Sequence, residues 1–188
     1  MKICVDPGHG MSNRSLGVFD PGCTHTEGGF QFREADIVLK YGLTLKDVLR
    51  AHQIEVFMTR DDATDHAPVG KRAANAKNAG CELFVSIHVN DADSEQANGF
   101  EVLFGAPKHE ALAQKMQTAL LAVMKTPSHR MKDRKIKLRN DLAVLAFRGP
   151  AVLIELGFIA FDKDRELMLN PQIREKVCET IADVLQGN

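Results

Sequence analysis

Two short apolar runs constrain the fold more strongly than any other feature of this sequence. Leu83–Ile87 is apolar except for Ser86, and Ala151–Ile154 is apolar throughout. A strand with one solvent-facing side alternates apolar and polar residues, whereas a nearly continuous apolar run is typical of a strand buried on both faces. These runs therefore predict a largely parallel sheet that is covered by helices on both faces.

The other segments alternate between strand-like and helix-like patterns. Further strands are predicted at Lys2–Val5, Ile54–Thr59, Gly99–Phe104 and Leu142–Phe147. Helical periodicity predicts helices at Arg33–His52, Val69–Ala79, His109–Lys125 and Pro171–Leu185. The alternation in Gly99–Phe104 favours a more exposed strand, and Met11–Phe32 and Thr126–Asp141 resemble loops in composition. We expect a single α/β domain over residues 1–188, with a mostly parallel, twisted sheet of about six strands and helices on both faces.

Composition narrows the class of protein. The 188 residues are 44% hydrophobic and 26% charged, which is ordinary for one globular domain, and the net charge of −1 gives no indication of nucleic-acid binding. No apolar run approaches the roughly 18–20 residues that cross a membrane, and the N-terminus is too short and polar for a signal peptide. We therefore expect synthesis in the cytoplasm. Reduced, buried thiols are expected for three of the four cysteines, Cys4, Cys81 and Cys178.

Polar residues follow three of the predicted strands directly. His9 lies in the glycine-rich loop after Lys2–Val5, His88 follows Leu83–Ile87, and Glu155 follows Ala151–Ile154. Because active sites of open α/β sheets gather beyond the carboxyl ends of the strands, these side chains are expected to meet at one edge. Taken singly, His9 is consistent with a solvated loop residue and His88 with a hydrogen-bonded core histidine. Glu155 has apolar neighbours, so its carboxylate must be paired, protonated or close to a metal.

Two histidines and one carboxylate with an open fourth position form the usual catalytic zinc site. The water held at such an open position has a pKa of about 7, and a further carboxylate is then needed to move protons. Glu27, Glu34 and Asp36 are the candidates near the first loop. The spacing of these three residues does not choose among them.

Several segments together resemble the zinc-dependent N-acetylmuramoyl-L-alanine amidases of the type-3 family. The resemblance extends from Ile3 to about Leu185, and its motifs occur in the family's order at Asp6–Gly10 (DPGHG), Asp20–Gly22 (DPG), Arg33–Asp36 (READ), Thr59–Asp61 (TRD), Leu83–Asn90 (LFVSIHVN) and Pro150–Phe158 (PAVLIELGF). This resemblance implies that His9, Glu34 and His88 bind Zn²⁺ and that Glu155 is the catalytic carboxylate. It implies peptidoglycan as the substrate and hydrolysis of the amide between N-acetylmuramic acid and L-alanine.

Other residues could still compete for these roles. Glu27 remains a minor alternative to Glu34, and Cys23 and His25 could imitate metal ligands, although the resemblance gives them no such role. Asn90 is expected to cap a turn. Surface positions are expected for the remaining histidines, His52, His66, His109 and His129.

The sequence departs from the family pattern at the rim of the predicted site. Met11 stands where a second glycine is usual, and Ile159–Phe161 stands where the family commonly has a small residue followed by Asn. The segment Met11–Phe32 is longer than typical. These departures concern substrate preference. The basic stretch Arg130–Arg139 is either a solvated loop or a contact for anionic wall polymers.

The resemblance is greatest to endolysins of phages or prophages, which are made in the cytoplasm and act on the wall after release or in the periplasm. Three rival functions remain open: a zinc exopeptidase, a non-catalytic peptidoglycan-binding module and an interaction protein with structural zinc. The last is disfavoured because structural zinc sites are normally closed and rich in cysteine.

Overall fold

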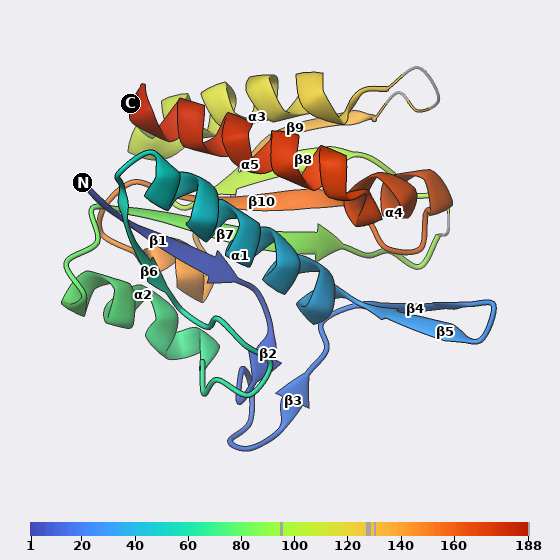
Figure 1. The fold of residues 1–188 in the computed structure, drawn as a ribbon, viewed down its shortest axis with the longest axis horizontal. Coiled ribbons are helices and arrows are strands. Elements are labelled where there is room, and N and C mark those ends of the chain that lie inside the picture. The colour runs from blue at the N-terminus through green and yellow to red at the C-terminus, as the bar shows by residue number, and fades with distance from the viewer. Residues whose placement is uncertain (95, 127–128, 130, 188) are drawn as a thin grey trace.

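A six-stranded sheet forms the centre of the molecule (Figure 1), in a computed structural model that describes residues 1–94, 96–126, 129 and 131–187. Its order is β6-β1-β7-β10-β8-β9, with bounds Glu55–Met58, Lys2–Pro7, Leu83–Asn90, Ala151–Phe158, Phe100–Phe104 and Asp133–Leu138. Adjacent strands are parallel except β10 and β8. The predicted α/β architecture with a mostly parallel sheet is confirmed.

Helices cover the two faces of the sheet unequally. One face packs against α1 (Glu34–Ala51), α3 (Glu110–Met124) and α5 (Pro171–Gln186), which lie side by side in Figure 1. A second hydrophobic cluster on the opposite face contains residues from α2 (Val69–Asn78) and from a 3₁₀ helix at Ala143–Ala146. The expectation of helices on both faces is therefore confirmed, and the second face has the lighter cover.

The sixth strand is not the one that the sequence predicts. Leu142–Phe147 was expected to be a strand, but it contains the 3₁₀ helix, whose Val144 and Leu145 pack into the second cluster. Thr126–Asp141 was expected to be a loop, but it contains β9. Because β9 pairs with β8 and α3 packs on both strands, every residue of β8 is buried, and the exposed position expected for Gly99–Phe104 is wrong.

The segment Met11–Phe32 is more ordered than its composition indicates. It forms two small antiparallel sheets, one from β2 (Gly10–Met11) and β3 (Phe19–Asp20), the other from β4 (Thr24–Glu27) and β5 (Phe30–Arg33). Both extend away from the central sheet in Figure 1. The short helix α4 (Asp162–Leu169) was also not predicted. Across the described part of the chain, no helix has the length and apolar character of a membrane span.

Candidate active site

The carboxyl ends of the central strands bring the predicted residues to one place. Glu155 on β10 is the register partner of His88 on β7, and Pro7 at the end of β1 is paired with Ile87. Leu153 belongs to the cluster on the lightly covered face, and side chains two positions apart on a strand share a face. Glu155 and His88 therefore lie on that face, beyond the cover that α2 and the 3₁₀ helix provide.

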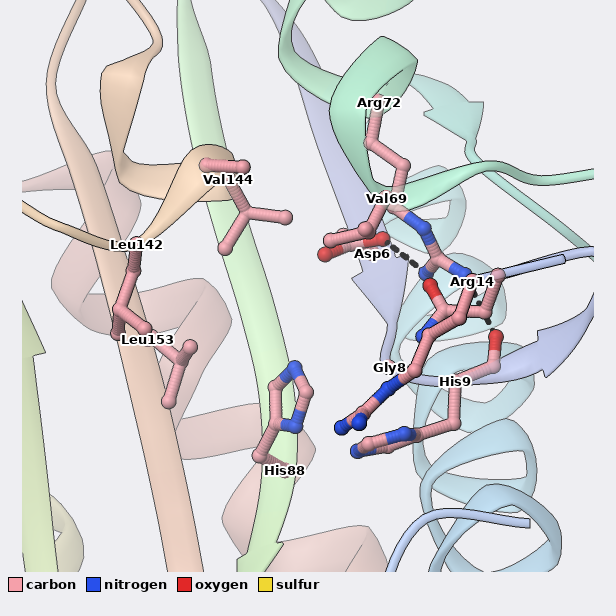
Figure 2. A pocket seen from close by; sticks show the side chains of 12 residues that line it. Asp6, Gly8, His9, Arg14, Val69, Arg72, His88, Leu142, Val144 and Leu153 are labelled. Carbon is pink, nitrogen blue, oxygen red and sulfur yellow. Dashed lines mark hydrogen bonds and ion pairs between the residues drawn. The ribbon is translucent and has the colours of Figure 1, made fainter. Parts of the chain in front are cut away.

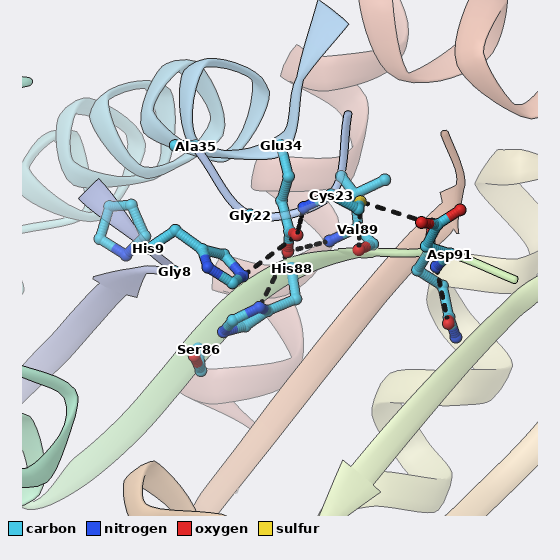
Figure 3. Close-up of polar contacts among 12 residues, drawn as sticks. Gly8, His9, Gly22, Cys23, Glu34, Ala35, Ser86, His88, Val89 and Asp91 are labelled. Carbon is cyan, nitrogen blue, oxygen red and sulfur yellow. Dashed lines mark hydrogen bonds and ion pairs between the residues drawn. The ribbon is translucent and has the colours of Figure 1, made fainter. Parts of the chain in front are cut away.

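The carboxylate of Glu34 lies between the two predicted histidines (Figure 3). Its Oε1 is 2.9 Å from Nδ1 of His88, and its Oε2 is 3.1 Å from Nε2 of His9. The backbone N–H groups of Val89 and Cys23 donate to the same two oxygens, at 2.9 and 3.0 Å. Burial would raise the pKa of Glu34, but the hydrogen bonds from His88 and His9 outweigh burial and lower it. Glu34 is thus held as a carboxylate.

Backbone geometry makes this close approach feasible. Glu34 is the first residue of α1, and its N–H donates to the carbonyl oxygen of Cys23. His9 has a φ of 61°, which residues other than glycine rarely adopt. A Cβ on Gly8 would overlap the ring of His88, and a Cβ on Gly22 would lie 2.5 Å from Oε2 of Glu34. The two glycines are required because side chains there would occupy the site.

Asp20 orients His9 from outside the cluster. Its Oδ2 is 3.1 Å from Nδ1 of His9 and accepts a hydrogen bond from Asn13, while its Oδ1 accepts one from the N–H of Gly22. Burial opposes ionisation, but the donors Asn13, Gly22 and His9 lower the pKa of Asp20 to about 2. A carboxylate on the second ring nitrogen is the usual support of a metal-binding histidine, since it fixes the tautomer and the ring orientation.

Two buried arginines hold the loop that carries His9. Arg72 donates to the carbonyl oxygens of Pro7 and His9, and Arg60 donates to those of Pro7 and Gly8. Arg72 also pairs with Asp6. No role could be predicted for these arginines from the sequence, because arginines are common on protein surfaces. The position of Arg60 in the Thr59–Asp61 motif was the only available signal.

The three side chains fit a metal ion. Ligand atoms of His9, Glu34 and His88 all lie within 4.8 Å of one another. Two imidazoles and one carboxylate with room for a further ligand form a donor set found in catalytic zinc sites. Within the described residues, one other group of potential ligands occurs, the largely exposed acidic loop Asp61, Asp62 and Asp65.

The alternative ligands lie elsewhere or have other partners. Asp36 pairs with Arg33, and Glu27 pairs with Arg165. The thiol of Cys23 donates to the carbonyl oxygen of Val89, and His25 lies in β4. Of the acidic candidates near the first loop, Glu34 is the one placed between the two histidines.

Glu155 is partly buried and differs from the buried carboxylates Asp6 and Glu34. Its Oε2 is buried and has no hydrogen-bond partner among the described residues. Burial raises the pKa of Glu155 to about 7, with the charge of Glu34 adding to the rise and His88 opposing it. A carboxyl group that titrates near neutrality can accept and donate a proton at the same pH.

Of the histidines expected at the surface, one is buried and another is partly buried. The surface prediction is wrong for His109, which ends a 3₁₀ turn at the start of α3 and is 5% exposed. It is also wrong for His129, whose ring lies 2.6 Å from a carboxylate oxygen of the fully buried Asp164. His52 and His66 are exposed as predicted. Cys4, Cys81 and Cys178 are free and buried, which confirms that prediction.

A cavity of about 330 Å³ opens beside His9 and His88 (Figure 2). Its wall is largely apolar and is built from α2, β10 and the segment around the 3₁₀ helix: Val69, Leu142, Ala143, Val144 and Leu153. Arg14 lies at its edge, with the side chain exposed and Nε 3.2 Å from Asp20. The cavity can accept an apolar group of a ligand that is bound next to the histidines.

Comparisons with known proteins agree with this geometry. The sequence model of the N-acetylmuramoyl-L-alanine amidase family matches residues 3–187. The probable cell wall amidase LytH of Staphylococcus epidermidis (strain ATCC 12228 / FDA PCI 1200) is 31% identical over 179 residues, which cover 94% of this chain and 54% of LytH. The germination-specific N-acetylmuramoyl-L-alanine amidase of Bacillus subtilis (strain 168) is 25% identical, covering 95% of this chain and 76% of that protein. The chain thus spans about half the length of LytH.

Solved structures show the same fold. The catalytic domain of CwlV, an N-acetylmuramoyl-L-alanine amidase from Bacillus (Paenibacillus) polymyxa var. colistinus, superposes with a TM-score of 0.85 at 25% identity, covering 99% of this chain and 96% of that domain. An N-acetylmuramoyl-L-alanine amidase from Clostridium difficile 630 also has a TM-score of 0.85, at 26% identity and with coverage of 99% and 95%. With its motifs, its fold and its matched length, this chain belongs to the N-acetylmuramoyl-L-alanine amidase family.

Proposed function

We propose that this chain is a zinc-dependent amidase that hydrolyses the bond between N-acetylmuramic acid and L-alanine in peptidoglycan, with residues 1–188 forming its catalytic domain. The observation that carries the proposal is the pairing of two features at adjacent strand ends. The possible ligand atoms of His9, Glu34 and His88 converge, and Glu155 lies next to His88 in register, with its Oε2 lacking a hydrogen-bond partner in the described part of the chain. Family membership supports the choice of amide bond.

In this proposal His9, Glu34 and His88 hold the zinc ion. Zinc bound there would supply Lewis-acid polarisation of an amide carbonyl and would lower the pKa of water. The chain prepares the ligands: Asp20 orients His9, and two backbone N–H groups fix the Glu34 carboxylate. Hydrogen bonds from His88 and His9 keep Glu34 ionised before the metal arrives.

Glu155 is proposed to move the protons. Its carboxylate removes a proton from the attacking water and then returns that proton to the nitrogen of the leaving L-alanine. A pKa of about 7 suits both halves of this cycle. The leaving amine must lie within hydrogen-bond reach of Glu155, so the stem peptide leaves on the β10 side of the metal ligands.

The biological setting is a further part of the proposal. We suggest that the chain acts as an endolysin, which is made in the cytoplasm and reaches peptidoglycan after release or in the periplasm. The basic stretch Arg130–Arg139 is proposed to contact anionic material at the wall, although Arg130 itself lies outside the described residues.

The reaction is tested by incubating the protein with purified peptidoglycan and identifying the soluble products by mass spectrometry, with and without a chelator. Free stem peptides with an unblocked L-alanine, lost on chelation and restored by zinc, are expected. Products that keep the bond between muramic acid and alanine would refute the amidase assignment. Cleavage of free dipeptides in preference to muropeptides would favour a zinc exopeptidase, and binding without amine release a non-catalytic module.

The ligand assignment is tested separately by metal analysis. His88→Ala should lose bound zinc, whereas His52→Ala, a change of an exposed histidine on the far end of α1, should retain it. A full equivalent of zinc in His88→Ala would remove His88 from the ligand set.

A further inference from the structure

A row of polar side chains continues across the sheet beyond Glu155. Glu155 on β10 is the register partner of His88 on one side and of Glu101 on β8 on the other. Register partners in adjacent strands point to the same face, so these three residues form one row. Glu101 is 5% exposed, and its Oε1 accepts a hydrogen bond from Asn90, two residues after His88. The Oδ1 of Asn90 also accepts a hydrogen bond from the N–H of the next residue, Asp91, at 2.9 Å.

Two cations from β9 converge on Glu101. Nε of Arg134 lies 2.8 Å and Nζ of Lys137 2.5 Å from the same oxygen, Oε2. These residues are three apart, and in a regular strand they would point to opposite faces. A bulge in β9 allows both side chains to point to one face. Phe100 pairs with Asp133 and Val102 with Ile136, so a step of two residues on β8 matches a step of three on β9, and Lys135 within that step has a φ of 68°. The backbone is thus shaped to place both cations on the row.

The cluster carries more positive charge than it needs for its own structure. Glu101 supplies one negative charge against the two cations. Nε of Arg134 donates a hydrogen bond to Glu101, and the guanidinium group lies over the ring of Phe158. The two terminal nitrogens of Arg134 have no hydrogen bond to a described residue. The side chains of Arg134 and Lys137 remain 28% and 42% exposed. A guanidinium end that is fixed at Nε and open at its fork is arranged to bind a carboxylate.

The stem peptide presents a carboxylate at the right distance. If the leaving L-alanine nitrogen lies at Glu155, as in the proposed function on which this inference rests, the peptide extends toward β8 and β9. Adjacent strands are about 4.8 Å apart, so the backbone of β9 lies roughly 10 Å from that of β10. The second stem residue, D-glutamate linked through its γ-carboxyl, carries its α-carboxylate roughly 6 Å from the L-alanine nitrogen. The side chain of Arg134 is long enough to bridge the remaining distance between the backbone of β9 and this carboxylate.

We propose that Arg134 and Lys137, held by Glu101, form a subsite for the free α-carboxylate of the second residue of the stem peptide. The subsite predicts a preference for stems in which this group is a carboxylate over stems in which it is a carboxamide. It also gives the basic stretch a specific ligand next to the catalytic carboxylate.

The test uses two disaccharide muropeptides that differ only in this group, the α-carboxylate or the α-carboxamide of D-glutamate. The wild-type protein with zinc should show a kcat/KM roughly 10–100-fold higher for the carboxylate, as expected for a charge-assisted contact. In Arg134→Gln this ratio should fall toward one, mainly through slower cleavage of the carboxylate substrate. Lys137→Gln should lower the ratio in the same direction, and Arg134→Lys should keep more of it than Arg134→Gln.

Lys135→Gln is the matched control, because it removes the same charge from the same strand at a side chain that pairs with Asp133. It should leave the ratio unchanged. Equal cleavage of both muropeptides by the wild type, or a full preference in both Arg134→Gln and Lys137→Gln, would overturn the subsite while leaving the amidase proposal intact. Failure of the wild type to cleave either muropeptide would overturn the proposed function and the subsite with it.

Discussion

Asp6 near the end of β1 and Glu155 on β10 both have buried carboxylate oxygens, and they differ in their surroundings. Asp6 is completely buried and accepts hydrogen bonds from Thr59, Ser86 and Arg72 at 2.6, 2.6 and 2.7 Å. Glu155 has a buried oxygen without a partner among the described residues. Burial acts on both groups, but the donors of Asp6 outweigh it and lower its pKa, whereas the pKa of Glu155 rises.

This difference separates a structural carboxylate from the one that we propose to act in the reaction. Asp6 neutralises Arg72, which in turn holds the loop of His9, so its charge is used by the fold. The charge of Glu155 is not used by any described partner and remains available for a substrate proton. A buried acid therefore indicates chemistry through its missing partners more than through its burial.

The largest predicted effect on stability belongs to Asp6→Asn. Removing the charge leaves Arg72 buried and unpaired, so the free energy of unfolding should fall by about 3–5 kcal/mol. Urea denaturation measures this change. Asp36→Asn is the control, because Asp36 and Arg33 form a partly exposed pair whose loss should cost less than about 1 kcal/mol. Equal effects of the two substitutions would contradict the structural role of Asp6.

The two carboxylates should contribute to the free energy of unfolding with opposite signs when the pH rises. The lowered pKa of Asp6 stabilises the fold at a pH above the ordinary pKa of an aspartate, and this contribution is lost as the pH falls below that value through the lowered pKa. The raised pKa of Glu155 penalises the fold as the pH rises toward and past about 7. In metal-free protein, the stability of Glu155→Gln relative to wild type should therefore increase by roughly 1–3 kcal/mol between pH 5 and pH 8. A difference that is constant over this range would contradict the raised pKa.

A smaller effect is expected for Asp20→Asn. The carboxylate of Asp20 is partnered, like that of Asp6, but one of its partners is the proposed ligand His9. Loss of this support should weaken zinc binding by about 10–100-fold. Competition with a chelator measures the affinity, and unchanged affinity would show that Asp20 does not orient His9.

The sequence predicts the parts of this site that follow directly from strand ends. His88 and Glu155 come immediately after apolar runs, so their position at one edge follows from the fold class. Glu34 is different, because its carboxylate reaches the histidines through the fold of the β4–β5 segment and the start of α1. Spacing along the chain holds no information about that path, and the choice of Glu34 came from the family resemblance.

Strand β9 and the 3₁₀ helix show why other elements could not be predicted. Strand β9 could not be predicted because it contains the charged residues Arg134, Lys135 and Lys137. In the structure Glu101 pairs with Arg134 and Lys137, and Asp133 pairs with Lys135. The periodicity of the sequence does not show these ion pairs. Leu142–Phe147 has the composition of a buried strand, but its apolar side chains pack as a 3₁₀ turn on the second cluster. A short apolar segment predicts burial more securely than it predicts backbone conformation.

The role of Glu155 is tested most directly by measuring the turnover and the stability of one variant, Glu155→Gln, on the same preparation. Glutamine keeps the shape and removes the unpartnered charge. We expect retained zinc and an activity on muropeptides lower by roughly 10² or more. With both proteins metal-free, the free energy of unfolding of the variant at pH 8 should be higher than that of the wild type. Near-normal turnover, or lost turnover together with a less stable fold, would contradict the assignment of Glu155 as the carboxylate reserved for chemistry.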